Sequence, residues 1–367
     1  MLASRDEQRH GEQADDWLAR GWNPFLPQKS DVWGRTPAIE MMLDSGRWHW
    51  DGWIKRRKER LAEQALETFG DFSNPRSAAT AARLLARCAS MHGGHGFDPL
   101  IVCLDDWKIP PNIMAPKAEA DSAKSAPALF AASPWGARQL LARGADPSLK
   151  SSAGATLWES WARRHMRGAL TLSELDDIAK VDPPTRLAEP GCRSPLGVDA
   201  IWARASGVAS RLAAAGVASS VFGARDAADL PALLCHAIQG GDTPELVAAL
   251  GSACGWPAIA EALWVAPSPA KRDSYHLGAG GGRCPARMAL ATGSVAVLGL
   301  LERSGALDLR RAEALMLPIW REPEPSGRAA RRPFEKPGRG YFDSAAWLWA
   351  RLPDDESSKK NALALWM

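Results

Sequence analysis

The sequence predicts an all-α protein, a solenoid of short helix-turn-helix repeats with irregular loop insertions. A helix-turn-helix pattern recurs along the 367 residues, and proline and glycine mark the starts and ends of its helices. The composition is 46% hydrophobic and 24% charged, which supplies a large core and excludes a disordered or fibrous chain. A stack of repeats replaces the separate domains that this length would otherwise suggest.

The clearest repeat is CPARMALATGSVAVLGLLERSGAL, residues 284–307. Pro285 fits the first turn of a helix, where its missing N–H costs no hydrogen bond. Small Ala289 allows two helices to approach closely, Gly293 allows a tight turn, and Gly305 can end the second helix in the left-handed conformation. The segment therefore predicts two helices joined by a turn at Gly293.

The same pattern returns along the chain in less regular form. The copies are residues 34–46, 126–147, 154–164, 194–216 and 233–255, with a half-unit at 17–24. In the 126–147 copy, the interval from Ala132 to Gly144 is about three residues short for the repeat. We therefore expect its inner helix or its turn to differ.

Other segments do not follow the repeat. Residues 47–69 carry many charges and space their apolar residues helically, which predicts an elongated helix. Residues 108–125 and 321–340 are rich in turn-forming residues and predict irregular loops. Residues 343–352 predict a helix that caps the open end of the stack. The expected divisions are 1–107 (Trp-rich units), 108–125 (loop), 126–307 (central repeats) and 308–367 (basic loop and capping helix).

These copies resemble the ankyrin repeat, in which a Thr-Pro-Leu-His segment opens the first helix and a Leu-Leu-x-x-Gly-Ala-Asp segment closes the second. Thr36-Pro37, Gly144-Ala145-Asp146 and the spacing of residues 284–307 carry the resemblance. The histidine is missing from every copy, and its place is taken by Ile39, Leu129, Gly197 and Arg287. The resemblance implies a module that binds a protein partner through its fingers and inner helices, on its concave face.

The charges are nearly balanced, with 45 basic and 42 acidic residues and a net charge of +3, so the protein lacks a general field for nucleic acid or an anionic membrane. The longest charge-free stretch, residues 246–260, is shorter than the roughly 20 apolar residues of a spanning helix. Residues 1–16 lack the apolar core of a secretory signal. The six cysteines are scattered. We therefore expect a cytoplasmic protein without a membrane segment.

Cys88, His92, His95 and Cys103 are four potential zinc ligands in one short segment. Structural zinc sites usually use tighter pairs of cysteines, and the glycines around the two histidines also fit a turn between helices. A loop with buried cysteines is the interpretation that we adopt, so we expect no metal. A zinc site is kept as the alternative.

Residues 276–284 contain Gly278, Gly280, Gly281 and Gly282, which suggests a phosphate loop. Such loops follow a strand and carry a Lys-Ser/Thr pair or an acidic ribose ligand, and neither is present. The segment precedes the 284–307 repeat, where the resemblance implies a glycine-rich finger. Since motifs typical of hydrolases, metalloproteases and kinases are also missing, we expect no enzyme, no catalytic residue and no cofactor.

The 17 tryptophans, compared with 8 phenylalanines and 2 tyrosines, fall into two groups. Those expected to pack inside helices are Trp158, Trp161, Trp202, Trp264 and Trp347. Those that crowd the N-terminal unit are Trp22, Trp33, Trp48, Trp50 and Trp53. One hairpin cannot easily enclose so many indoles, and clustered exposed aromatics are typical of interfaces. A partner surface and an unusually hydrophobic cap are both compatible with this N-terminal cluster.

Function follows from these features as an expectation. We expect a bacterial protein-binding module, which fits an adaptor, an immunity or inhibitor protein, a component of a defence or secretion assembly, or an effector. The expected partner-binding residues are Trp22, Trp33, Trp48, Trp50, Trp53, Arg283, Arg287, Arg331 and Arg332. The alternative is a nucleic-acid-binding or zinc-dependent protein that uses the basic residues of 321–341 or the Cys88–Cys103 segment.

Overall fold

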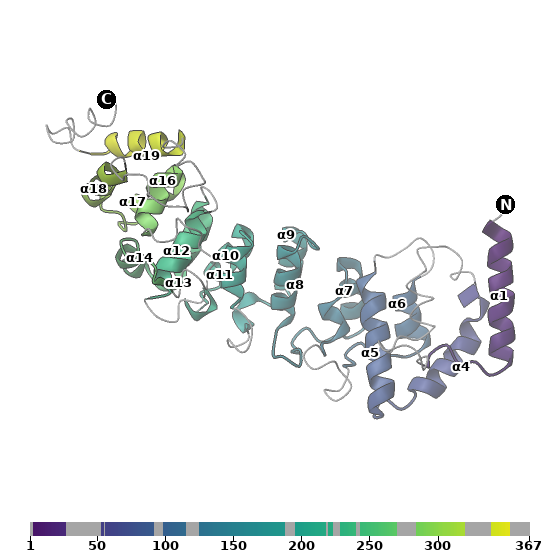
Figure 1. Cartoon of the computed structure of the whole chain (residues 1–367). Coiled ribbons are helices and arrows are strands. Elements are labelled where there is room, and N and C mark those ends of the chain that lie inside the picture. Colours follow the sequence, from purple (N-terminus) through teal and green to yellow (C-terminus); the bar gives the residue numbers. More distant parts are fainter. Residues whose placement is uncertain are drawn as a thin grey trace. The chain divides into compact units, whose positions relative to one another are not determined.

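A computed structural model describes residues 3–26, 53–54, 56–91, 98–114, 125–187, 195–217, 219–222, 228–239, 243–269, 284–319 and 339–352 (Figure 1). All regular elements within these ranges are helices, which confirms the predicted all-α class there. None of the helices described is long and apolar enough to cross a membrane. The chain divides into two compact units: unit 1 is Met1–Trp161 with Ser173–Ala188, and unit 2 is Ala162–Leu172 with Glu189–Met367.

Unit 1 is built around one alanine- and leucine-rich helix, α5 (Pro75–Ser90). Asn74 caps this helix by accepting a hydrogen bond from the backbone N–H of Arg76, and Pro75 occupies the first turn. The helices and turns of this unit before α8 are α1 (Ala3–Ala19), α4 (Lys58–Phe69), α6 (Pro99–Ile101), the π-helical turn η2 (Val102–Asp106), the 3-10 turn η3 (Ala128–Phe130) and α7 (Pro134–Ala142). Of these, α4, α6, α7, η2 and η3 contact α5.

Three buried rings join the loop after α1 to the rest of unit 1. Phe25 meets Phe69 edge-on at 5.5 Å between ring centroids, and it meets Trp107 edge-on at 4.7 Å. All three rings are almost fully buried. Such edge-to-face pairs are each worth about 0.5–1.5 kcal/mol beyond the area that they bury.

The N-terminus of α8 (Leu157–Met166) carries two kinds of cap. Thr156 and Glu159 form a reciprocal capping box, in which each side chain accepts from the backbone N–H of the other residue. The buried carboxylate of Asp182 accepts from the backbone N–H of Trp158 at 2.8 Å. Asp182 follows α9 (Leu172–Ala179) and precedes the short turn η4 (Pro184–Arg186).

In the residues that the structure describes, unit 2 contains three helical hairpins in two layers. The hairpins are α10 (Leu196–Trp202) with α11 (Ser206–Ala214), α12 (Leu230–Gln239) with α13 (Pro244–Cys254), and α16 (Pro285–Thr292) with α17 (Val295–Arg303). The first helices contact one another in the order α10, α12, α16, and the second helices in the order α11, α13, α17. We call α10, α12 and α16 the first-helix layer. The other described elements of the unit are the second half of α8, η5 (Ser219–Phe222), α14 (Trp256–Ala262), α18 (Leu309–Ile319) and α19 (Arg339–Trp349).

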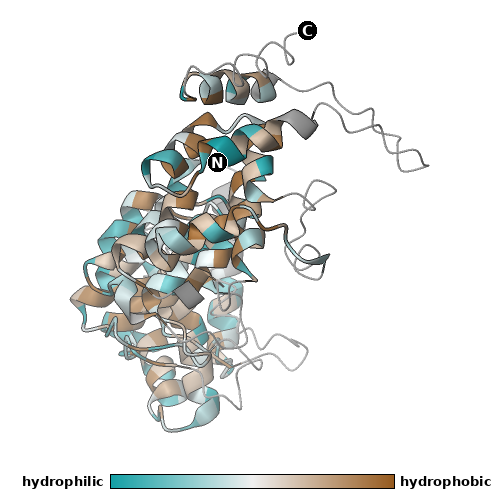
Figure 2. Cartoon of the chain, turned by 90° about the vertical axis from the view of Figure 1, so that its left-hand side faces the viewer, coloured by the Kyte–Doolittle hydropathy of each residue, from teal (hydrophilic) through white to brown (hydrophobic). Residues whose placement is uncertain are grey.

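The last helix, α19, packs against α16, α17 and α18. Hydrophobic and hydrophilic residues alternate along it, as Figure 2 shows for the helix nearest the C-terminal label. Tyr341, Ala345 and Leu348 are buried, and the Tyr341 hydroxyl donates to the Met316 carbonyl at 3.1 Å. The predicted helix at 343–352 therefore exists, although it begins and ends a few residues earlier.

Six of the described helices end in the same turn, the Schellman motif. In this turn the residue after the left-handed position donates its N–H to a carbonyl five residues earlier, which satisfies the end of the helix. The left-handed residues are Gly21, Gly144, Gly168, Arg204, Gly293 and Gly305, with φ of 84°, 84°, 76°, 54°, 76° and 72°. Gly293 lies at the turn between α16 and α17. The roles predicted for Gly293 and Gly305 are confirmed.

The predicted repeats differ in how fully they form two helices. The 194–216, 233–255 and 284–307 copies each contain two helices. In the 126–147 copy the first helix is reduced to η3, which is the departure expected from its short spacing. The 154–164 copy lies in α8 and the residues before it, the long helix expected at 47–69 is represented by α4, and the 34–46 copy lies outside the described residues.

Candidate interaction surfaces

Several of the predicted partner-binding residues lie outside the part of the chain that the structure describes. They are Trp33, Trp48, Trp50, Arg283, Arg331 and Arg332. Trp22, Trp53 and Arg287 are described and can be placed.

Trp53 is a buried residue, which corrects its assignment to a partner surface. Its side chain is 2% exposed, and its indole N–H donates to Asp15 Oδ1 at 3.0 Å. The same carboxylate accepts two hydrogen bonds from the Arg57 guanidinium, at 2.8 Å and 2.5 Å. An indole that is enclosed and has its N–H satisfied by α1 belongs to the core of unit 1 and is not available to a partner.

Trp22 is half-buried and contacts Trp17, which sequence reasoning did not select. The two rings meet edge-on at 5.7 Å, and Trp17 is 45% exposed. The Trp22 carbonyl accepts from Gln64 on α4 at 3.3 Å. The exposed aromatic surface of this corner is therefore made by Trp17 together with Trp22. Trp17 lies one helical turn before Gly21, and this position in the sequence is the signal that could have identified it.

Among the tryptophans predicted to be core, the structure separates three groups. Trp158, Trp161 and Trp347 are buried, as predicted, and the Trp161 indole donates to the Leu129 carbonyl at 3.1 Å. Trp264 is half-buried beneath the Arg311 guanidinium, which lies 4.6 Å from its ring centroid. The prediction for Trp202 is wrong because this side chain is 38% exposed.

Trp202 is exposed because it is the last residue of α10 and lies at the edge of the first-helix layer. The other apolar residues of α10 are buried, from Leu196 to Ile201. Gly197 shows how tightly α10 packs, because a Cβ at this position would lie 2.7 Å from Phe222 on η5. The helix that carries Trp202, α10, is therefore held in place by its close packing.

His236 of α12 lies under the Trp202 ring. The two ring centroids are 4.5 Å apart and the planes are inclined by 36°. His236 is half-buried, whereas the apolar residues around it on α12 are buried. Arg287 is half-buried on α16, the next helix of the layer. We call Trp202 and His236 the first-helix stripe, because two consecutive helices of one layer contribute one residue each.

Asp199 lies one turn before Trp202 on the same helix. Its carboxylate forms an ion pair with Arg163 of α8. The negative charge at this position is therefore compensated within unit 2. The first-helix stripe combines an aromatic ring and an imidazole.

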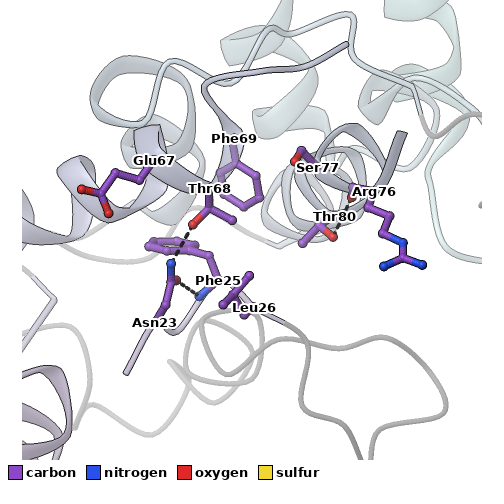
Figure 3. Close-up of a pocket in the computed structure, with 9 residues that line it drawn as sticks. All are labelled: Asn23, Phe25, Leu26, Glu67, Thr68, Phe69, Arg76, Ser77 and Thr80. Atoms are coloured by element: carbon purple, nitrogen blue, oxygen red, sulfur yellow. Dashed lines mark hydrogen bonds between the residues drawn. The ribbon is translucent and has the colours of Figure 1, made fainter. Parts of the chain in front are cut away.

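Unit 1 has an open pocket of about 430 Å³ between the loop after α1 and the facing ends of α4 and α5 (Figure 3). Phe25, Leu26 and Phe69 give it an apolar floor, and Leu26 is 53% exposed. Figure 3 shows Glu67 and Arg76 on opposite sides of these residues. The remaining lining residues are polar: Asn23, Thr68, Ser77 and Thr80.

Three of the six polar residues that line this pocket, Asn23, Thr68 and Thr80, bond through their side chains within the protein. The Asn23 amide donates to Thr68 Oγ1 at 2.8 Å, and its oxygen accepts from the Phe25 backbone N–H at 2.9 Å. Thr80 donates to the Arg76 carbonyl at 3.0 Å. The pocket is thus suited to an apolar side chain, and its lining lacks a nucleophile hydrogen-bonded to a base.

Cys88 and Cys103 lie together in the interior of unit 1. Their Sγ atoms are 3.7 Å apart, and burial raises the pKa of the Cys103 thiol well above its usual value. His92 and His95 lie outside the described residues, and within the described ranges no three His, Cys, Asp or Glu side chains converge as metal ligands. Zinc binds cysteine as the thiolate, which this environment disfavours.

Comparisons of the chain with models of protein families, with curated proteins and with solved structures give no match.

Proposed function

We propose that the protein is a protein-binding module and that the first-helix stripe of unit 2 is the centre of its partner surface. The observation that carries the proposal is Trp202, a tryptophan that is 38% exposed and stacked on His236 at the edge of a closely packed layer. Exposed aromatic rings on a rigid support are typical of interface hot spots.

The architecture of unit 2 supports the same use. Consecutive helices of one layer present side chains at little cost in conformational entropy, because the helices are fixed by packing before a partner arrives. The resemblance to ankyrin repeats supports it as well, since that family binds partners through its inner helices and fingers. We extend the surface to Arg287 because it lies on the third helix of the layer.

We further propose that the module works in a reducing compartment such as the cytoplasm. The support comes from two neighbouring thiols, Cys88 and Cys103, whose sulfur atoms lie 3.7 Å apart without a covalent bond. Cytosolic proteins normally keep such pairs reduced.

Partner capture by the full-length chain tests the function. The immobilised protein is compared with Trp202→Ala and with the matched control Trp17→Ala, which removes an exposed tryptophan of unit 1. We expect a partner that is retained by the wild type and by Trp17→Ala and is depleted at least about tenfold with Trp202→Ala.

The partner so identified is then purified and titrated against the three proteins by calorimetry. Equal circular dichroism spectra of the three proteins show that the comparison is between folded chains. Equal affinity of Trp202→Ala and the wild type for every captured partner contradicts the proposal.

A further inference from the structure

The pocket of unit 1 is flanked by two charges of opposite sign. Glu67 lies in the last turn of α4 and Arg76 in the first turn of α5, and Figure 3 shows them on opposite sides of the apolar floor. Both side chains are exposed, and no ion pair among the described residues includes either of them. The pocket therefore offers a carboxylate on one side and a guanidinium on the other.

Each charge has the sign that the end of its own helix disfavours. The first turn of a helix is positive and the last turn negative, so acidic side chains stabilise the first turn and basic side chains the last. The last turn of α4 has Glu67 and no basic residue, and the first turn of α5 has Arg76 and no acidic residue. Asp71, in the loop between the two helices, accepts from Ser73 and does not line the pocket. The two side chains therefore strengthen the fields of the helix ends, which makes one side of the pocket negative and the other positive.

The floor between the two charges is apolar and partly in contact with solvent. Phe25 and Phe69 are buried and meet edge-on, whereas Leu26 is 53% exposed. The volume of about 430 Å³ lies in the range of about 300–1,000 Å³ that is typical of pockets for small ligands. One large apolar side chain of a partner can therefore enter the pocket and cover Leu26.

The opposite charges decide which class of ligand fits. A nucleic acid or an anionic lipid would place phosphates against Glu67 as well as against Arg76, whereas a peptide can present one charge of each sign beside an apolar side chain. We propose that the pocket is a second docking site, for a peptide segment of a partner protein that carries a basic, a large apolar and an acidic residue. The apolar side chain packs on Leu26, the basic residue pairs with Glu67 and the acidic residue pairs with Arg76. The site uses residues of unit 1 alone, so it adds to the first-helix stripe of unit 2 and does not depend on it.

Three fluorescein-labelled peptides test the charge pattern, and their binding to the full-length protein is followed by fluorescence anisotropy at low salt. Each has phenylalanine between two alanines. The mixed peptide has two lysines at one end and two glutamates at the other, and the like-charged peptides have only lysines or only glutamates at both ends. We expect the wild type to bind the mixed peptide about fivefold more tightly than either like-charged peptide, because only the mixed peptide places an opposite charge at both Glu67 and Arg76.

Two charge reversals test which residue makes each contact. Arg76→Glu makes both sides of the pocket acidic, so the lysine peptide should become the tightest ligand, and with Glu67→Lys the glutamate peptide should. Both variants should fold, since the side chains are exposed and the new charges suit their helix ends. Arg87→Glu is the matched control, because Arg87 is an exposed arginine about three turns further along α5. This control should keep the preference of the wild type.

Equal or undetectable binding of the three peptides by the wild type would overturn the inference, and so would an unchanged preference in Arg76→Glu and Glu67→Lys. Analytical ultracentrifugation tests whether the occupant is a second copy of this chain. A wild-type dimer that Arg76→Glu converts to a monomer would overturn the inference as well. Partner capture that still depends on Trp202 would leave the proposed function intact in each of these cases.

Discussion

Asp15 determines the different roles of two tryptophans in unit 1. Its carboxylate accepts from the Trp53 indole and from the Arg57 guanidinium, which fixes the Trp53 ring inside the unit. Trp17 lies two residues later on α1, yet it is 45% exposed because it faces away from this contact and meets only the edge of Trp22. Asp15 satisfies the buried indole N–H of Trp53.

We predict that Trp53→Ala destabilises the protein by about 3–5 kcal/mol, because it leaves a cavity and removes the indole hydrogen bond to Asp15. Trp17→Ala should cost less than about 1 kcal/mol, since its ring is largely solvated. Urea unfolding curves measure both values. Similar losses for the two variants would show that Trp53 is not a core residue.

Cys235 makes the stability of unit 2 depend on pH in the alkaline range. Burial raises the pKa of its thiol from 9.0 to about 12. The folded state therefore keeps the proton while the unfolded thiol ionises, so the contribution of Cys235 to stability is complete below pH 9 and is lost as the pH rises from about 9 towards 12.

We predict that the wild type loses about 1 kcal/mol more unfolding free energy than Cys235→Ala when the pH is raised from about 8 to about 10. Urea titrations of both proteins at the two pH values measure this difference. Parallel pH dependence of the two proteins would indicate that the Cys235 thiol ionises as readily in the folded state as in the unfolded state.

The sequence predicted the core positions of Trp158, Trp161 and Trp347 because each recurs on the apolar side of its helix. It misplaced Trp202 for a physical reason: periodicity places a residue on a face but does not show whether another element covers the end of that face. It also could not assign Trp53 to the core, since the covering residue, Asp15, is distant in sequence.

At the scale of helices and turns, glycine has two different roles in this chain. Gly144 is left-handed with free space around it, whereas Gly136 is helical and lies against α5, where an added Cβ would be 2.2 Å from the Ala89 carbonyl oxygen. Gly144 is required for its left-handed backbone conformation, whereas Gly136 is required because α7 approaches α5 closely.

We predict that Gly136→Ala destabilises unit 1 by more than Gly144→Ala does. The Gly144 substitution should cost about 1 kcal/mol from the left-handed backbone alone. The Gly136 substitution forces α7 away from α5 and should cost at least about 2 kcal/mol. Thermal unfolding compares the two variants, and a smaller loss for Gly136→Ala would contradict the packing of α7 on α5.

Helix starts and ends were the most predictable elements, since Pro285, Gly293 and Gly305 act locally. The first helix of the 126–147 copy was less predictable. Its spacing indicated a departure, but its reduction to the single turn η3 depends on contacts with α5 that lie beyond the repeat itself.

At the scale of the whole molecule, charge balance limits what the protein can bind. The net charge of +3 provides no long-range field for a polyanion, so binding of a polyanion would depend on local groups. The two compact units each have their own buried residues, and the proposed partner surface lies on unit 2.

We predict that duplex DNA and single-stranded RNA bind no more tightly than about 10⁻⁵ M at physiological salt, the range of non-specific contacts. Fluorescence anisotropy with labelled oligonucleotides across a salt series measures this affinity. Tight binding that falls steeply with salt would favour the nucleic-acid alternative based on residues 321–341.

Oxidative footprinting of the complex tests whether the first-helix stripe is covered by a partner. Free protein should be oxidised at Trp202 and Trp17, which are exposed, and spared at Trp158, which is buried. Addition of the captured partner should protect Trp202 and leave Trp17 reactive. A saturated complex in which Trp202 is oxidised as fast as in the free protein would contradict a partner surface on the first-helix stripe.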